Sequence, residues 1–417
     1  MSFRVFSPAG GASSASSGLT YNVKDYGAKG DARRVDDAVT TGSGTTITSA
    51  TANFTAADVG KQIWGISAGG ILRLARTTIA SVVSSTEVNV TSNSSGSASG
   101  VTLIIGTNDT DALQAATTAA KAANARGAVH VPSGGYIFTE LPFNFGEASV
   151  VHAACSLVGD GSNSTVFYPA PDYDFGTATS NTGIFAKFDA YSRDGRIEGL
   201  RVEGQAYSMS GSGYIVISDF GNGLTLRDVR IEHVRGLTAH VSLGGADFLV
   251  DRCHFEGASY LGVLVAGGGV FQNSYTGNHG YVGLQIASVG GEGNTSLHLA
   301  VIGCIIDEST GYSAYVQASK DVKFTACRFF GPSSAYACVV DGTSKARFVN
   351  CEVIDFGNTG NRGGLKVLSG GVAFVTACRF HGCGTLYGID NAGTVYDGGN
   401  NETNSKTGSA ISASPAL

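Results

Sequence analysis

Apolar and small residues recur in fixed columns through the second half of the chain. Between residues 250 and 380, six short segments repeat one pattern, in which a small residue is followed two positions later by a larger apolar or aromatic one. The first column holds Cys253, Asn273, Cys304, Cys327, Cys351 and Cys378, and the second holds Phe255, Tyr275, Ile306, Phe329, Val353 and Phe380. Because side chains alternate along a strand, both columns point to the same face. Such recurrence is typical of the stacked coils of a solenoid.

A further apolar column lies three residues before the first. It contains Leu226, Val250, Val270, Val301, Phe324, Phe348 and Val375. An odd separation between two inward columns requires a bend in the strand, so each coil is expected to turn a corner there. Another short strand, such as GVLVA at 262–266, follows a loop in each repeat. Three strands and three turns close one coil, which predicts an all-β, single-stranded parallel β-helix with three sheets and about ten coils.

Composition supports this fold and narrows the partners. Gly accounts for 60 of 417 residues, Pro for 7 and charged residues for 14%, which suits short strands joined by tight turns. A net charge of -6 without a basic cluster argues against a nucleic-acid partner. No apolar run is long enough to cross a bilayer, and residues 1–18 lack the apolar stretch of a secretory signal. We therefore expect neither membrane insertion nor Sec-dependent secretion.

The eight cysteines fit the interior of the coils better than a disulfide or metal framework. Five of them occupy the first column, where a stacked thiol acts as a small apolar filler. No CxxC pair or Cys/His finger spacing occurs, so no metal is expected on these thiols. We predict reduced core cysteines in a protein synthesised in a cytoplasm.

The rest of the chain divides into an opening segment, a cap, an insertion and a tail. Residues 1–18 are mostly Pro, Gly, Ala and Ser, which predicts a flexible linker carrying an attachment peptide, or simply a disordered tail. The predicted boundaries are 19–39 for the start of a cap motif, 40–106 for a small antiparallel β insertion, 107–127 for a capping helix, 128–400 for the parallel β-helix and 401–417 for a C-terminal tail. The helix begins near Asp109 and ends at Gly127, and its small-residue face would cover the open end of the solenoid.

Two segments on either side of the insertion carry a family resemblance. YGAKGD at 26–31 and DTDALQAA at 109–116, followed by GAVHVPSGGYIF at 127–138, resemble the opening of the pectate-lyase-like right-handed parallel β-helix proteins, which include bacteriophage tailspikes and polysaccharide depolymerases. The resemblance covers residues 19–31 and 108 to about 400 and implies a right-handed helix. It further implies a homotrimeric virion protein, made in the host cytoplasm, that binds a bacterial surface polysaccharide and joins other virion or tail proteins through its N-terminus. No cofactor is expected, apart from calcium if the protein is a lyase.

The outward position three residues after the first column suggests chemistry. It carries Glu203, Glu232 and Glu256, then Thr276 and Asp307. Carboxylates on adjacent coils would lie roughly 5 Å apart, a spacing used by retaining glycosidases, and stacked like charges are expected to raise one pKa. We predict Glu232 and Glu256 as an acid and base pair, with His254 and Arg230 as further catalytic residues.

A second interpretation of this face involves no catalysis. Arg201, Arg230 and His254 occupy the outward position between the two inward columns, so acidic and basic columns run side by side. A solvated lattice of ion pairs would explain both columns.

Further polar and aromatic residues near this face are candidates for substrate binding. They are Glu203, His233, His240, Gln285, Tyr260 and Tyr281. Tyrosine rings hold sugars by stacking and hydrogen bonding, although the same face could be where identical chains meet, and lone histidines are more often structural.

Two functions from different classes remain open at this point. The first is a tailspike-like protein that binds and cleaves a bacterial surface polysaccharide, as a hydrolase or a lyase. The second is a non-enzymatic trimeric virion fibre, receptor binder or structural adhesin. The calcium-binding acid clusters of pectate-lyase-like enzymes find no counterpart, and Asn278-His279-Gly280 only partly matches the GHG motif of polygalacturonase-like hydrolases.

Overall fold

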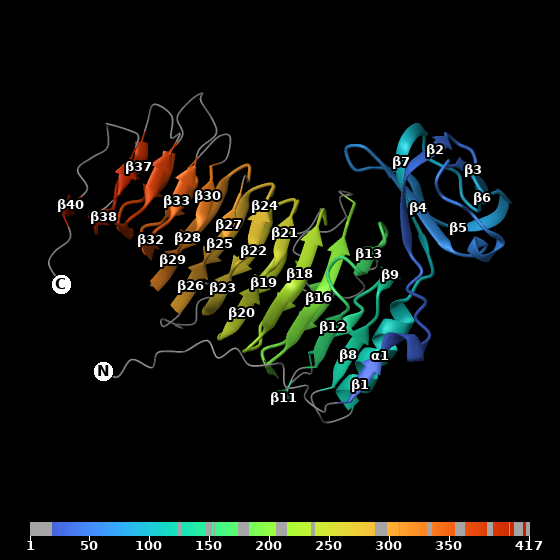
Figure 1. Cartoon of the computed structure of the whole chain (residues 1–417), viewed down its shortest axis with the longest axis horizontal. Helices are drawn as coiled ribbons and strands as arrows, with labels where there is room; N and C mark the ends of the chain where they lie inside the picture. Colours follow the sequence, from blue (N-terminus) through green and yellow to red (C-terminus); the bar gives the residue numbers. More distant parts are fainter. Residues whose placement is uncertain are drawn as a thin grey trace.

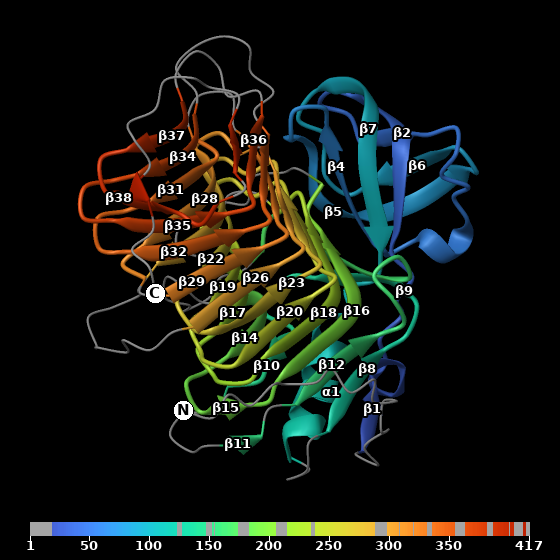
Figure 2. The ribbon, with the colours of Figure 1, turned by 60° about the vertical axis from the view of Figure 1, so that its left-hand side comes forward.

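A computed structural model shows a parallel β-helix with a small barrel beside its N-terminal coils (Figures 1 and 2). It describes residues 19–122, 127–146, 152–153, 155–173, 183–205, 215–234, 238–287, 298–307, 309–319, 321–331, 336–354, 363–381, 387–399, 401–403 and 412–413. The predicted linker at 1–18 and most of the predicted tail at 401–417 lie outside these residues. No helix among the described residues is both long and apolar enough to span a membrane.

Most coils contribute two of their strands to one long parallel sheet of 22 strands. Strands on one side of its corner are β1 (Thr20–Asn22), β8 (Ala128–Val131), β12 (Ser156–Gly159), β20 (Phe248–Asp251), β23 (Gly269–Gln272), β26 (His298–Ile302), β29 (Asp321–Thr325), β32 (Lys345–Val349), β35 (Val372–Thr376), β38 (Thr394–Asp397) and β40 (Ser412–Ala413). Strands on the other side are β9 (Gly134–Phe138), β13 (Thr165–Pro169), β21 (His254–Glu256), β24 (Tyr275–Gly277), β27 (Ile305–Ile306), β30 (Arg328–Phe330), β33 (Glu352–Ile354), β36 (Arg379–His381) and β39 (Glu402–Thr403). Two longer strands, β16 (Arg196–Glu203) and β18 (Thr225–Glu232), run through the corner.

The remaining strand of each coil forms a second parallel sheet. Its ten strands are β10 (Phe143–Asn144), β14 (Gly183–Phe188), β17 (Ile215–Asp219), β19 (Ala239–Leu243), β22 (Leu261–Val265), β25 (Val282–Ala287), β28 (Tyr312–Gln317), β31 (Cys338–Val340), β34 (Gly363–Val367) and β37 (Tyr387–Asn391). A two-stranded sheet pairs β11 (His152–Ala153) with β15 (Ser192–Arg193). The prediction of an all-β parallel helix is confirmed, and the first two of the three strands in each coil join at the corner into one sheet.

The interior of the coils holds the predicted apolar columns. Cys253, Cys304, Cys327, Cys351 and Cys378 are buried and free, as expected for thiols that fill a core. The corner just before this column is made by left-handed backbone, with φ near +53° at positions such as Arg252, Ala326 and Asn350. A left-handed residue reverses the alternation of side chains, so it accounts for the odd spacing between the inward columns.

One coil departs from the predicted columns by a single residue. Strand β24 pairs Tyr275 with His254 and Thr276 with Phe255, so Ser274 and Thr276 face the core. The assignment of Asn273 and Tyr275 to the inward columns is therefore wrong, and Thr276 does not follow Glu256 in the outward column. Since the side-chain period of a strand is two, a shift of one residue reverses which residues point inward. In the neighbouring column Phe271 replaces Val270 for the same reason.

The N-terminal end of the β-helix is covered by the α-helix α1 (Thr110–Ala122), which buries Leu113, Ala116 and Ala120. The carboxylate of Asp109, at the start of α1, accepts hydrogen bonds from the backbone N–H groups of Lys29 at 2.6 Å and Gly30 at 3.2 Å. These bonds join the two parts of the cap motif, which the insertion separates in the sequence.

The insertion forms a closed antiparallel barrel of six strands. They are β2 (Arg33–Thr41), β3 (Thr46–Thr48), β4 (Gln62–Ser67), β5 (Ile71–Ser84), β6 (Glu87–Val90) and β7 (Ser97–Gly106). Short 3₁₀ helices lie at η1 (Val23–Tyr26) and η2 (Ala56–Asp58). The barrel has its own apolar core and begins at Arg33, within the residues assigned to the cap motif from the sequence.

Candidate functional site

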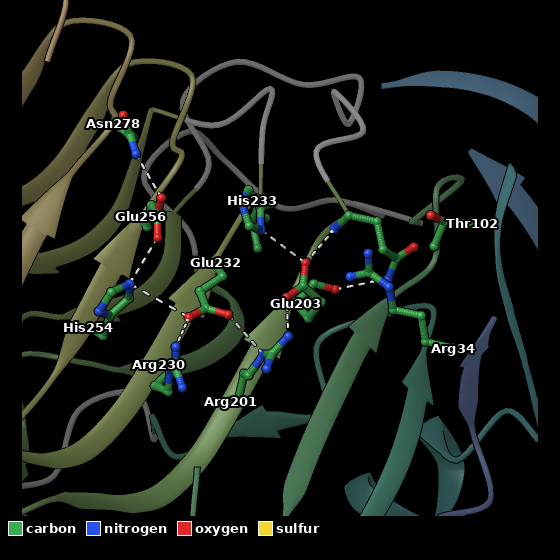
Figure 3. Close-up of polar contacts among 12 residues, drawn as sticks. Arg34, Thr102, Arg201, Glu203, Arg230, Glu232, His233, His254, Glu256 and Asn278 are labelled. Atoms are coloured by element: carbon green, nitrogen blue, oxygen red, sulfur yellow. Dashed lines mark hydrogen bonds and ion pairs between the residues drawn. The ribbon is translucent and has the colours of Figure 1, made fainter. Parts of the chain in front are cut away.

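Strands β16, β18 and β21 bring the predicted catalytic residues together on the outer face of the long sheet. Their register pairs Glu203 with Glu232 and Glu232 with Glu256. The same register aligns Arg201, Arg230 and His254, two residues earlier. Neighbouring parallel strands lie about 4.8 Å apart, so the three carboxylates form a column with basic side chains between them. Figure 3 shows this set, called the carboxylate column below.

Glu203 lies at the barrel-proximal end of the column and is enclosed by basic and amide groups. Arg201 donates a hydrogen bond to Glu203 Oε2 at 2.5 Å, and His233 Nδ1 lies 3.2 Å from Oε1. The backbone N–H of Gln205 also donates to Oε1, at 3.1 Å. With only 1% of its side chain exposed, Glu203 cannot contact a substrate directly. Its predicted role in substrate binding is therefore wrong.

Glu232 lies in the middle of the column between two guanidinium groups. Arg230 donates to Glu232 Oε1 at 2.5 Å, and Arg201 Nε lies 3.0 Å from Oε2 as an ion pair. Its side chain is 7% exposed. The imidazole of His254 approaches Oε1 at 3.7 Å, which connects Glu232 to the next coil.

Glu256 forms the open end of the column. His254 Nε2 donates to Glu256 Oε2 at 3.0 Å, and Asn278 Nδ2 donates to Oε1 at 2.7 Å. The ring of Tyr275 stacks on His254, with centroids 4.5 Å apart. The side chain of Glu256 is 26% exposed, so exposure of the carboxylates increases along the column.

The pKa shifts in the column differ from the prediction made for stacked carboxylates. Burial alone would raise the pKa of Glu203, but the hydrogen bond from His233 and the charge of Arg201 lower it to about 2. Burial also acts on Glu256, yet its hydrogen bonds from His254 and Asn278 lower the pKa of that carboxyl overall. The expected upward shift is absent from both because basic groups alternate with the acids. The hydrogen bond to Glu203 conversely raises the pKa of His233.

A calcium ion fits this cluster poorly. Glu232, His254 and Glu256 place one ligand atom each within 4.8 Å of one another. Calcium takes about six to eight oxygen ligands, whereas one of these groups is an imidazole. Arg230 also donates to the carboxylate of Glu232, so a cation would have to compete with a guanidinium.

Of the other predicted substrate-binding residues, His240 lies inside the coil. It is fully buried, its Nε2 lies 3.1 Å from the carbonyl oxygen of Val234, and burial lowers its pKa to about 3. The prediction that His240 contacts a substrate is therefore wrong. The sequence offered no signal for this, because every residue of β19 (Ala239–Leu243) is buried, so alternation along the strand does not distinguish His240 from its neighbours.

Tyr260 and Tyr281 lie at the start of successive strands of the second sheet. Their rings stack with centroids 4.9 Å apart and an interplanar angle of 9°. Tyr260 is 48% exposed. Gln285, on the outer face of the same sheet, donates from Nε2 to Gln317 Oε1 at 3.4 Å. Tyr260 follows Glu256 in the same coil, whereas Tyr281 and Gln285 lie in the next coil, after β24, and all three remain candidates for sugar contact.

Two residues of the site were missed from the sequence. Asn278, singled out only within a partial GHG motif, binds the carboxylate of Glu256, and its φ of 55° is a conformation that Asn tolerates well. Gln205 accepts a hydrogen bond from the indole of Trp64, far away in the chain, at 3.1 Å. His279 of the same GHG echo is buried and accepts from the backbone N–H of Ala258 instead of facing solvent.

Comparison with known proteins finds one family model and several solved structures. Several solved structures are similar: the A-module of mannuronan C-5 epimerase AlgE4 of Azotobacter vinelandii (14% identity, 74% of this chain and 96% of that chain, TM-score 0.48), the Dettilon tailspike protein (12%, 71% and 64%, 0.43) and PfbA, a surface adhesin of Streptococcus pneumoniae (13%, 72% and 90%, 0.45). None of the curated proteins matches the chain. Residues 182–353, which carry the carboxylate column, match the family model described as a right handed beta helix region. This match and the parallel sheets of the structure identify residues 182–353 as a right-handed parallel β-helix region.

Proposed function

We propose that the protein binds a bacterial surface polysaccharide along the carboxylate column and cleaves it at Glu256. The observation that carries this proposal is the cluster of Glu232, His254 and Glu256. One carboxylate oxygen of each glutamate and one imidazole nitrogen of the histidine lie within 4.8 Å of one another. Exposure increases toward Glu256, so a chain of sugars can reach the last carboxylate without displacing the ion pairs of the first two.

The environments of the ionisable groups suggest separate roles for them. Glu256 has a lowered pKa and is ionised at neutral pH, which suits a base or a nucleophile rather than an acid. The hydrogen bond from His233 to Glu203 raises the pKa of the imidazole, which favours its protonated form on the same face. In this assignment the proton donor is His233, rather than one of the glutamates.

A panel of purified capsular polysaccharides and lipopolysaccharide O-chains tests the proposal. Incubation with the full chain is expected to release new reducing ends if it is a hydrolase, and an ultraviolet-absorbing unsaturated uronate if it is a lyase. Glu256→Gln should abolish either product. Glu352→Gln is a matched control, because Glu352 is 27% exposed, pairs with Arg328 and lies on a later coil. Full activity in Glu256→Gln would exclude the assignment.

A second candidate function is a non-enzymatic carbohydrate binder. It is favoured by the strong ion pairing of Glu203 and Glu232, which holds both carboxylates as acceptors. The stacked pair of Tyr260 and Tyr281 gives such a binder an aromatic platform for a sugar ring. Binding to a glycan of the panel without release of any product would favour this candidate.

The finer assignment that we propose is a homotrimeric tailspike or virion fibre. In this proposal residues 1–18 attach the protein to other virion or tail proteins, and the outer face of the second sheet is where copies meet. Light scattering of the purified chain is expected to give the mass of a trimer, and a monomeric mass would contradict this arrangement.

A further inference from the structure

The barrel is fixed against the coils that carry the carboxylate column. Trp64, Ile66 and Ile104 of the barrel pack with Ile137 and Tyr168 of the β-helix. The Trp64 indole donates to Gln205, whose own backbone N–H donates to Glu203. The barrel is therefore joined to the enclosed end of the column by a continuous set of buried contacts.

A second interaction between the barrel and the β-helix is an ion pair. Arg76 of the barrel donates to both carboxylate oxygens of Asp172, at 2.5 and 2.7 Å. A bidentate pair fixes orientation as well as distance. The buried contact of Trp64 and the ion pair of Arg76 with Asp172 together fix the orientation of the barrel relative to the coils.

The barrel face toward the column changes from apolar to polar across three paired strands. The register pairs Trp64 with Ile104 and Ile104 with Arg34, and a second row pairs Ile66 with Thr102. Trp64 and Ile104 are fully buried against the β-helix, whereas the side chain of Arg34 is 39% exposed. The polar residues thus form the rim of the contact.

Arg34, Asp36 and Thr102 make one hydrogen-bonded group on this rim. Arg34 Nε and the Thr102 hydroxyl both donate to Asp36 Oδ1, each at 2.8 Å. Asp36 is 61% exposed, and among the described residues its other oxygen accepts no hydrogen bond. The group therefore presents guanidinium donors beside a free carboxylate oxygen.

This group lies near the Glu203 end of the column. In the view of Figure 3, Arg34 and Thr102 lie toward the end of the column where Glu203 and Arg201 are drawn. Tyr168, which is buried between the barrel and the coils, is the side chain on which the charges of Arg201, Glu203, Arg34 and Asp36 all act. A sugar chain that follows the column toward the barrel would meet Arg34 and Asp36 next.

We propose that Arg34 and Asp36, with the Thr102 hydroxyl, bind the vicinal hydroxyls of a neutral sugar unit next to the column. Adjacent hydroxyls each donate and accept a hydrogen bond, which matches guanidinium N–H donors beside a carboxylate acceptor. Because Asp36 neutralises Arg34, the group has little attraction for the carboxylate of an acidic sugar. The proposal rests on the proposed function, since it extends the same polysaccharide site onto the barrel.

The test measures binding and cleavage separately in the full chain. The probes are fluorescently labelled oligosaccharides made from neutral and from uronate-containing capsular polysaccharides. Arg34→Gln and Asp36→Asn are expected to weaken binding of the neutral probe about tenfold and to leave the cleavage rate at saturating sugar unchanged. Arg328→Gln, which removes an exposed, ion-paired arginine elsewhere on the helix, should change neither quantity.

The possible outcomes separate this inference from the proposed function. Unchanged binding of the neutral probe by both variants would overturn the barrel site and leave the cleavage site intact. Binding confined to uronate-containing probes would overturn the neutral class of sugar. If the wild-type chain binds none of the probes, both proposals fail. The fluorescence emission of Trp64, the single tryptophan, should match that of the wild type in both variants. Such a match shows that the barrel keeps its contact with the β-helix.

Discussion

Two groups of histidines in neighbouring coils have opposite environments. On the outer face, His233 and His254 donate to the carboxylates of Glu203 and Glu256. Inside the coils, His240 and His279 face each other edge to face, with ring centroids 5.5 Å apart. The outer pair is bonded to acids and partly exposed, whereas the inner pair is buried and contacts no carboxylate among the described residues.

The difference shows that the partner and the solvent decide what a histidine can do. A carboxylate partner raises the pKa of His233, which favours the protonated form of an imidazole at the surface. Burial instead lowers the pKa of His240 to about 3 and that of His279 well below its usual value. Gly262 makes room for the inner pair, because a Cβ there would lie 2.3 Å from His279 Nε2. The inner histidines are structural, and the outer ones belong to the candidate site.

Acid is expected to have the largest effect on stability. His240 has a folded pKa near 3 and an ordinary pKa of 6.5 when unfolded, so its contribution is complete above pH 6.5 and is lost as the pH falls below it. At pH 4 this histidine alone should reduce the free energy of unfolding by ~3 kcal/mol. Urea unfolding at pH 7 and pH 4 measures the loss.

The matched variants are His240→Gln and His298→Gln. The first removes the buried titrating group and should reduce the acid-dependent loss, whereas the second changes an exposed histidine and should not. The same loss in His240→Gln as in the wild type would contradict the structural role of the inner pair.

His233 acts with the opposite sign: its raised pKa stabilises the fold at low pH, and this stabilisation is lost as the pH rises through the folded pKa.

Glu203→Gln should have the next largest effect. It removes the charge that Arg201 and His233 share at the enclosed end of the column, which leaves a half-buried guanidinium with fewer partners. We expect the free energy of unfolding to fall by about 2 kcal/mol at pH 7. The deficit should shrink as the pH approaches 2, where the wild-type carboxyl is also protonated. A deficit that is independent of pH would show that the charge is not its cause.

Trp64→Phe should have a smaller effect. Phe keeps most of the apolar contact with Ile104 and Tyr168 but leaves the side-chain oxygen of Gln205 without the indole N–H. The expected destabilisation is about 1 kcal/mol, followed by circular dichroism during urea unfolding. Phe54→Leu, deep in the barrel core, is the comparison for a loss of packing alone, and it should leave cleavage unaffected. If Trp64→Phe leaves both stability and sugar binding unchanged, the hydrogen bond of the indole does not hold the barrel in place.

Glu256→Gln should have the smallest effect on stability. The carboxylate is partly exposed, and an amide of the same shape can keep an acceptor for His254 or Asn278. The melting temperature is expected to stay within about 2 °C of the wild type. A much larger decrease would mean that this end of the column is structural, like the end at Glu203.

The fold was predictable because its evidence repeats in every coil. Cysteines and large apolar residues recur at one spacing, so a single shifted coil, the one with Ser274 and Thr276 inside, did not obscure the pattern. That shift was hidden because Asn273 and Tyr275 are as plausible in an inward column as their neighbours. The left-handed conformation at Asn273, which defines the corner, has no unique residue type among the coils.

The site was predictable only in outline. The register of Glu203, Glu232 and Glu256 follows from the repeat, but the interleaving guanidinium contacts and the resulting downward pKa shifts depend on side-chain geometry. The contact of Trp64 with Gln205 joins residues 141 positions apart, and no local pattern encodes it.

The most direct test of the central claim measures sugar binding and product release together in Glu256→Gln. The probe is a polysaccharide of the panel that the wild-type chain cleaves, and Glu352→Gln is the control. We predict that Glu256→Gln binds this polysaccharide with an affinity close to that of the wild type and releases product at least about a thousandfold more slowly. Equal rates of product release in Glu256→Gln and Glu352→Gln would contradict the claim that the open end of the carboxylate column is where the polysaccharide is cleaved.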